Sequence, residues 1–226
     1  MNGRGSTYTF TTDYGGYYGS PVYNYVPRGM RFSGEELKHI LLAMVVLIFA
    51  FTIILYRFYS NYLPLDLGIA VVAGFTGFLF HELMHKYFAQ KFGAWAEFRS
   101  SRFGLLLAFI TALLGFLFAA PGAVYISGYL DRRQNGIVSI AGPLTNSSFS
   151  ILFLLLAVAF SSNFILFESL AYISFLDAWL GVFNMLPIPP LDGYKVLRWN
   201  AGSYAAGIIL PLAIIGILTV MGVGFL

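Results

Sequence analysis

The chain of 226 residues contains no cysteine, and only 10% of its residues are charged. Without cysteine there is no disulfide, no thiolate metal ligand and no cysteine nucleophile. Soluble domains carry about 25% charged residues, so this scarcity of charge, together with 58% hydrophobic residues, indicates a polytopic membrane protein. The net charge of +3 is small and its carriers are scattered among apolar segments, which argues against nucleic-acid binding.

Residues 1–36 differ in composition from the rest, because they are rich in Tyr, Gly, Ser and Thr and show no helical or strand periodicity. This composition predicts a flexible N-terminal tail, followed by a transmembrane domain over residues 37–226. A helix needs about 20 apolar residues to cross a bilayer core of about 30 Å. Five segments have that length and are predicted to cross the membrane: 40–58, 65–88, 137–160, 164–186 and 201–226.

A sixth apolar stretch, residues 103–127, is interrupted by glycine and proline. Cytoplasmic loops of membrane proteins collect Lys and Arg. If this stretch does not cross, all thirteen basic residues except Arg57 lie on the cytoplasmic side with the N-terminus, whereas a single crossing puts five of them outside. We therefore expect the stretch to dip into the membrane and return, or to lie against the bundle. The expected fold is an all-α membrane protein with five to six spans and a small β element between the second and third.

The segment His81-Glu82-Leu83-Met84-His85 places three polar groups near the end of the second predicted span. Four residues on a helix advance about 400°, so both imidazoles share one face and can bind one ion, with Glu82 at the rim. His81 lies about 24 Å along the helix from Leu65, inside the bilayer near its cytoplasmic face. Lys86, Gln90 and Lys91 are expected to reach outward to that interface.

Ionisable groups in a bilayer cost several kcal/mol each, so three of them together favour a metal site over an incidental cluster. The spacing suits zinc, which needs a third protein ligand. The candidates are His39, Asp66, Asp177 and Asp192. His39 and Asp66 start their helices on the wrong side or at the wrong depth, whereas prolines 187, 189 and 190 break the fourth span just before Asp192, at the membrane level of His81.

Asp177 remains open between two interpretations, because an intramembrane carboxyl can line a water path to the metal or bond as a protonated acid to a neighbouring helix.

The H-E-x-x-H segment, together with Asn184-Met-Leu-Pro-Ile-Pro-Pro-Leu-Asp-Gly193, resembles the site-2 protease family of intramembrane zinc metalloproteases. The segment SIAGPLTN, residues 139–146, is similar to a third motif of that family, and the resemblance covers residues 65–198. It implies one Zn²⁺ held by His81, His85 and Asp192, with Glu82 as general base. By family position Asn184 is the candidate oxyanion donor, and Asn146 is a second polar group facing the core.

The resemblance implies hydrolysis of peptide bonds in or near transmembrane segments of protein substrates. The expected location is the cell membrane, with the N-terminus and the active-site end cytoplasmic and the lipid bilayer as surroundings. A strand formed by APGAVYI, or an edge strand between Glu97 and Ser127, is expected to hold the unwound substrate by strand addition. Two alternatives stay open: a non-catalytic relative that binds membrane partners, and a metal transporter, although no inverted repeat is visible.

Overall fold

The computed structural model describes residues 30–60, 62–118 and 120–224. Most of the predicted tail lies outside these residues. Within its last part, helix α1 (Gly34–Leu55) already begins, because Ser33 accepts a hydrogen bond from the Glu36 N–H at 3.1 Å and caps the helix. Residues 34–36 of the predicted tail therefore belong to the first turn of α1.

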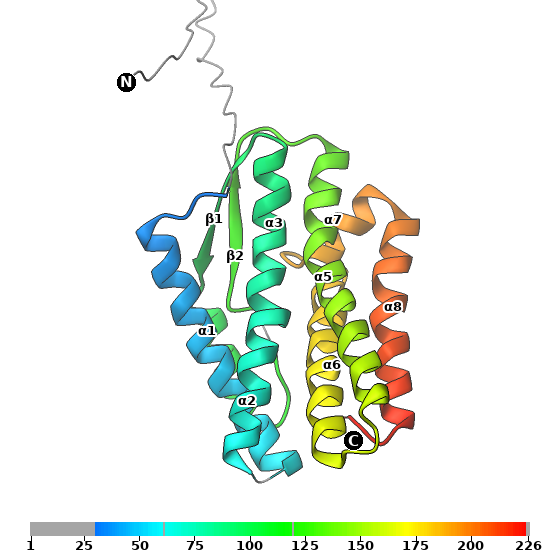
Figure 1. The fold of residues 1–226 in the computed structure, drawn as a ribbon. Helices are drawn as coiled ribbons and strands as arrows, with labels where there is room; N and C mark the ends of the chain where they lie inside the picture. Colours follow the sequence, from blue (N-terminus) through cyan, green and yellow to red (C-terminus); the bar gives the residue numbers. More distant parts are fainter. Residues whose placement is uncertain (1–29, 61, 119, 225–226) are drawn as a thin grey trace, which may run out of the picture.

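Within the described residues, five helical segments are long and apolar enough to cross a membrane, as predicted (Figure 1). The first consists of α1 and a π-helical end, Tyr56–Ser60. The second joins α2 (Leu63–Ala73) to α3 (Phe80–Lys91) through a π-helical segment, Gly74–Leu79. The others are α5 (Arg132–Ala159), α6 (Phe164–Asn184) and α8 (Ala201–Val220). The predicted all-α membrane class is confirmed.

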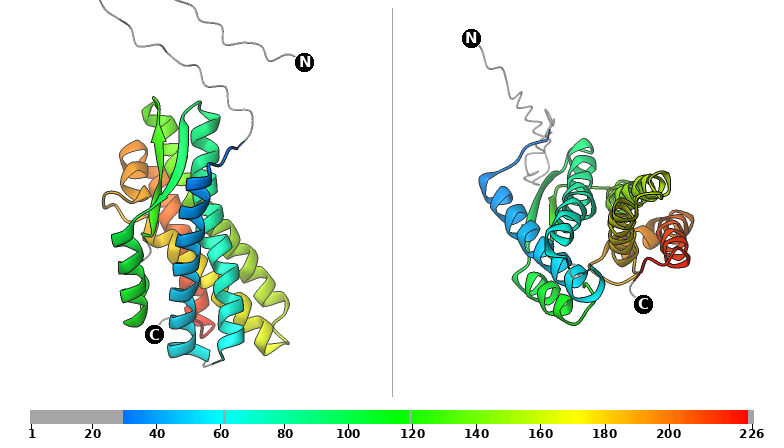
Figure 2. Two further views of the ribbon diagram at one scale, coloured as in Figure 1. Left: turned by 90° about the vertical axis from the view of Figure 1, so that its left-hand side faces the viewer. Right: turned by 60° about the horizontal axis from the view of Figure 1, so that its bottom comes forward.

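The sixth apolar stretch does not form a further span. It begins as α4 (Arg102–Leu113), a helix of 12 residues packed along α1, and then turns back (Figure 2). The Thr111 hydroxyl accepts a hydrogen bond from the Phe118 N–H at 3.0 Å, which holds the returning chain against α4. The chain returns as β2 (Gly122–Ser127), antiparallel to β1 (Trp95–Ser100), and confirms the predicted β element between the second and third spans.

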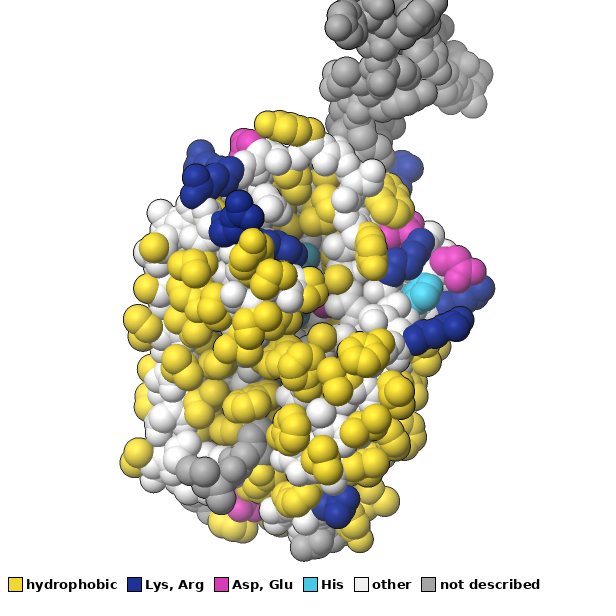
Figure 3. Space-filling model, turned by 180° about the vertical axis from the view of Figure 1, so that it is seen from behind, with side chains coloured by type: hydrophobic (Ala, Val, Ile, Leu, Met, Phe, Trp, Pro, Cys, Tyr) yellow, Lys and Arg dark blue, Asp and Glu magenta, His cyan; other side chains and the backbone are white. Residues whose placement is uncertain are grey.

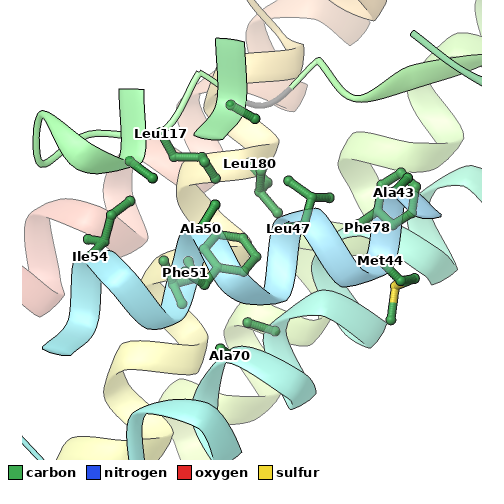
Figure 4. Close-up of a cluster of buried hydrophobic side chains, with 14 of the residues drawn as sticks. Ala43, Met44, Leu47, Ala50, Phe51, Ile54, Ala70, Phe78, Leu117 and Leu180 are labelled. Atoms are coloured by element: carbon green, nitrogen blue, oxygen red, sulfur yellow. The ribbon is translucent and has the colours of Figure 1, made fainter. Parts of the chain in front are cut away.

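The main apolar core surrounds α1 (Figure 4). Phe51 and Leu47 are fully buried there among small residues, including Ala70 on α2 and Ala50 on α1. Helices in lipid gain little from burying apolar surface, so close packing between small residues is what holds them together. The Phe78 ring also meets the Phe98 ring of β1 edge-on, with 5.3 Å between centroids, which ties the sheet to the second span.

A buried ion pair fixes the start of α1 against α3 and the sheet. Lys86, 1% exposed, binds Glu36, 0% exposed, and the other Glu36 oxygen accepts the Phe98 N–H at 3.0 Å. The expectation that Lys86 reaches outward was therefore wrong, because a carboxylate from the start of α1 neutralises it inside the fold. Gln90 is also buried, while Lys91 is exposed.

Basic side chains gather toward one end of the bundle, and hydrophobic side chains cover much of the visible face below them (Figure 3). The start of α1, the end of α3, the start of α5 and the end of α6 all lie toward that end. Arg57 belongs to the opposite end, where its guanidinium donates to the Leu113 carbonyl at 3.1 Å.

Candidate metal centre

Helix α3 carries both histidines on one face. The imidazoles of His81 and His85 meet edge to face, with ring centroids 4.6 Å apart, and their Nε2 atoms lie 2.9 Å apart. Both side chains are almost fully buried. The π-helical turn ends directly before α3, and such turns are frequently found at functional sites.

Asp192 reaches the same point from a different part of the chain. Its Oδ2 atom lies 3.0 Å from His85 Nε2 and 3.4 Å from His81 Nε2. Helix α6 ends at Asn184, and after the proline-rich turn a helix that the sequence did not predict, α7 (Asp192–Trp199), begins at Asp192. Gly193 permits this close return, since a Cβ there would stand 2.1 Å from the Met185 carbonyl oxygen. His81, His85 and Asp192 thus offer ligand atoms that all lie within 4.8 Å of one another.

Helix α5 supplies the hydrogen-bond partners that orient both imidazoles. His85 Nδ1 lies 2.7 Å from the Val138 carbonyl, and His81 Nδ1 contacts the Asn146 Oδ1 atom. Both partners are acceptors, so each Nδ1 carries the proton and each Nε2 presents a lone pair. Two lone pairs and a carboxylate oxygen at such short separations repel one another unless a cation lies between them. The donor set of two imidazoles and one carboxylate is one that zinc takes in catalytic sites.

Gly142 on α5 has no side chain, and the two imidazoles occupy the space that a side chain there would fill. A Cβ at this position would stand 2.5 Å from His85 Nε2 and 2.6 Å from His81 Nε2, closer than real atoms approach. The sequence singled out Gly142 only as part of a motif and Asn146 also as a polar group facing the core, and the structure places both residues against the candidate metal ligands. Pattern alone could not assign Asn146 to His81, because the two residues lie on different helices.

Glu82 and Asn184 line the same cavity as the three candidate ligands. Glu82 is 9% exposed, and its Oε2 atom has no hydrogen-bond partner within the described structure. The Asn184 amide donates to the Leu180 carbonyl at 3.0 Å, which leaves its second N–H available. Lys195 also lines the cavity, with its Nζ atom 3.5 Å from Asp192 Oδ1.

The other acidic and imidazole candidates lie elsewhere, as the depth argument predicts for two of them. His39 Nδ1 contacts Ser100 Oγ at 2.7 Å, and Asp66 accepts from Ser60 Oγ at 2.5 Å. Asp177 is fully buried on α6 and contacts the Thr76 hydroxyl at 2.9 Å, behind the metal centre and outside the ligand set.

Strand β2 forms one wall of the cavity, through residues including Gly122, Val124 and Ile126. The Phe98 N–H of β1 points away from β2, since it donates to Glu36. Phe98 pairs with Val124, so the backbone N–H and C=O groups of Val124 also point away from the partner strand, β1. This direction repeats at every second residue of an antiparallel pair, so the backbone groups of Gly122 and Ile126 point the same way as those of Val124. Within the described residues none of them has a hydrogen bond across that edge.

The fold and this site define a polytopic membrane protein in which two histidines and an aspartate that could hold a metal ion lie beside a helix-borne glutamate. The chain is 40% identical over 193 residues to "Putative zinc metalloprotease MJ0611" of Methanocaldococcus jannaschii, a match that covers 84% of this chain and 96% of that protein. It is 32% identical over 159 residues to "Putative zinc metalloprotease YwhC" of Bacillus subtilis, covering 61% of this chain and 71% of the relative.

A third relative, "Putative zinc metalloprotease Rip2" of Mycolicibacterium smegmatis, is 32% identical over 146 residues, which cover 58% of this chain and 56% of that protein. No family model matches the chain, and no solved structure matches it significantly. The relative from M. jannaschii is matched over nearly its whole length. The chain therefore belongs to the site-2 protease family of zinc metalloproteases.

Proposed function

We propose that this chain is an intramembrane zinc metalloprotease that hydrolyses peptide bonds within or near the transmembrane segments of other membrane proteins. The observation that carries the proposal is the convergence of His81, His85 and Asp192 beside the unpartnered carboxylate of Glu82. The helix that carries both histidines belongs to a segment long enough to span a membrane. The printed names of two relatives describe those proteins as putative zinc metalloproteases, which is the same chemistry.

His81, His85 and Asp192 would hold one zinc ion through two Nε2 atoms and one carboxylate oxygen. Bound zinc supplies an acidified water and polarises the scissile carbonyl. Glu82 takes the proton from the attacking water and passes it to the leaving amine, a role that its free oxygen in the cavity supports. Asn184 donates its second amide N–H to the developing oxyanion.

The substrate enters as an extended segment, since a helical peptide bond is enclosed by its own hydrogen bonds. The outward-facing backbone groups of Gly122, Val124 and Ile126 can pair with such a segment and add it to the sheet beside the metal centre. The opposite edge of the sheet is already occupied, because β1 bonds to Glu36 and His39 of α1. Substrate pairing is therefore directed to β2.

Val124→Pro tests this pairing without breaking the sheet, because the lost N–H is one that β1 does not use. Cleavage should fall at least tenfold while bound zinc stays at the wild-type level. Val124→Ala removes the side chain but keeps the N–H, and should cleave within about twofold of wild type. Equal cleavage by the proline and alanine variants would exclude β2 as the pairing edge.

The end of the bundle that carries most of the basic residues is proposed to face the cytoplasm, in accordance with the charge asymmetry of membrane proteins. The metal centre lies toward that end, because α7 follows the end of α6 and α3 ends there. The substrate bond would then be cut near the inner surface of the cell membrane. Labelling of single introduced cysteines from each side of sealed vesicles tests the orientation, and this cysteine-free chain suits that experiment.

The decisive experiment compares wild type with Glu82→Gln, using zinc analysis of purified protein and cleavage of a model transmembrane substrate. We expect about one zinc per chain in both proteins, and cleavage only by the wild type. Equal cleavage by Glu82→Gln would remove the proposed base. Zinc binding without any cleavage by wild type would favour a non-catalytic relative, and zinc uptake into proteoliposomes would favour a transporter.

A further inference from the structure

The sheet lies between α1 and α3, and in the described part of the chain the hydrogen bonds that join it to the helices are made by β1 (Figure 1). Three residues along the outer edge of β1 have side-chain partners on α1 or α3: Ala96 with Gln90, Phe98 with Glu36, and Ser100 with His39. Within the same residues β2 has hydrogen bonds to β1 and to no helix. A two-stranded sheet alone is marginally stable, so the position of β2 depends on how firmly β1 is held.

Glu36 is the strongest of the three anchors of β1. Its side chain is 0% exposed, and its bond to the Phe98 N–H measures 3.0 Å, whereas the backbone contacts at the two neighbouring positions of the edge measure 3.3 and 3.4 Å. Hydrogen bonds to an ionised group are about twice as strong as those between neutral groups. The centre of the β1 edge is therefore held by a buried carboxylate.

Stability alone does not explain why a carboxylate is buried here with Lys86. Replacing a buried ion pair by apolar side chains of similar volume is often neutral or stabilising. The two oxygens of Glu36 have separate partners, because Lys86 of α3 binds Oε2 while Oε1 accepts the Phe98 N–H. An apolar pair would fill the same space but would leave this N–H without an acceptor. What Glu36 adds is thus a fixed position for β1.

The position of Phe98 is passed on to the strand edge proposed to bind substrate. Phe98 lies opposite Val124, the middle residue of that edge. Opposed residues of a pair without mutual hydrogen bonds have Cα atoms about 4.5 Å apart, so a shift of one strand carries the other with it. Successive residues of a strand are about 3.4 Å apart. A substrate paired with a displaced β2 would therefore bring a displaced or neighbouring bond to the candidate metal centre.

We propose that Glu36 is a positioning residue for cleavage: by holding the Phe98 N–H it fixes β1, and through the pairing of Phe98 with Val124 it sets which substrate bond meets the metal centre. The inference rests on the proposed protease function and on strand addition at β2. Glu36 acts through the sheet, while Lys86 neutralises the carboxylate and holds its other oxygen.

Two double variants separate the hydrogen bond from the ion pair. Glu36→Gln with Lys86→Met, the acceptor-keeping variant, removes both charges and keeps an oxygen for the Phe98 N–H. Glu36→Leu with Lys86→Met, the acceptor-free variant, removes that oxygen as well. The products of a model transmembrane substrate are identified by mass spectrometry, and bound zinc is measured in parallel.

The acceptor-keeping variant should cut the same bond as wild type, at a rate within about threefold of wild type. The acceptor-free variant should cut that bond at least tenfold more slowly, because misplacement of reacting groups by about 1 Å costs about 100-fold in rate. It should also release products cut at neighbouring bonds. Zinc content should be the same in both variants, since neither changes a candidate ligand.

The position of β2 can also be measured without zinc and without cleavage. Tyr125→Cys on β2 and Leu155→Cys on α5 carry spin labels at two exposed sites of this cysteine-free chain. The distribution of distances between the labels should match that of wild type in the acceptor-keeping variant. It should broaden in the acceptor-free variant, because β1 is then held less firmly.

Glu35→Gln is the matched control, because Glu35 precedes Glu36 in the first turn of α1, is exposed and pairs with Lys38. It should leave the products and their rate of formation unchanged. If the acceptor-free variant does not fold, Glu36→Met with Lys86→Met also removes the acceptor, with a side chain that adapts more easily to the space, and should give the same result.

Wild-type products, rate and label distances in a folded acceptor-free variant would overturn the proposal. An equal loss of cleavage at the wild-type bond in both double variants would overturn it as well, because the acceptor oxygen would then make no difference. Failure of the proposed protease function is distinguishable, since it would appear as absent zinc or absent cleavage in wild type.

Discussion

Gly142→Ala adds a single methyl group at the point where α5 passes the metal centre. The new carbon would stand 2.5 Å from His85 Nε2, about 0.9 Å short of the 3.4 Å at which ordinary van der Waals contact begins. The backbone of α5 is held in place by α3 and α6, so the imidazoles must move. Overpacking of this kind costs about 1–3 kcal/mol.

That displacement acts directly on the Nε2 atoms that are proposed to bind zinc. A cost of about 1.4–2.8 kcal/mol corresponds to a 10–100-fold loss of zinc affinity. Misplacement of reacting groups by about 1 Å lowers catalytic rate about 100-fold, so cleavage should fall at least that far even when zinc is in excess.

Zinc affinity is measured by competition with a chelating dye, and cleavage is measured on the model transmembrane substrate at saturating zinc. Gly68→Ala is the matched control, because Gly68 lies in the same helical span as His81 and a Cβ there meets nothing within 4 Å. The control should behave as wild type. Unchanged zinc affinity and cleavage in Gly142→Ala would refute the placement of both imidazoles against α5.

Asp192→Ala should remove the carboxylate ligand and lower zinc occupancy of the purified protein below half, as measured by elemental analysis, whereas retained stoichiometric zinc would contradict its role. Glu36→Gln leaves the ammonium of Lys86 buried without a charged partner, so unfolding free energy in detergent should fall by about 3–5 kcal/mol, and the double variant Glu36→Gln with Lys86→Met should recover part of that loss. Gly136→Ala should destabilise the packing of α5 on α7 by about 1–3 kcal/mol, because the new carbon would stand 2.2 Å from the Trp199 ring, and an unchanged melting temperature would contradict this contact.

The parts of the fold that depend on local pattern could be predicted from the sequence. Span length follows from hydropathy, and the shared face of His81 and His85 follows from helical geometry over four residues. The prolines that end the fourth span predicted the depth of Asp192 in the bundle. Helix α7 was missed, because eight residues of mixed polarity give no span signal and their apolar face is fixed only by packing against α5 and α8.

The long-range partners of the site could not be predicted, because they depend on how each helix is rotated about its axis. Lys86 illustrates the difference. Its position near the end of a span favours an outward-reaching side chain, yet Glu36, 50 residues earlier, meets it inside the protein. Hydropathy describes how deep a residue lies along the membrane normal, whereas these contacts depend on which neighbour its helix face meets.

Lys86 directly follows His85 on α3, and its partner Glu36 also binds the Phe98 N–H of β1. One carboxylate therefore links the helix that carries the two proposed histidine ligands to the covered edge of the sheet. The free edge at Val124 is separated from Glu36 only by the width of that sheet, since Phe98 and Val124 are paired. The same contact that neutralises a buried lysine thus fixes the distance between the metal centre and the strand proposed to hold the substrate.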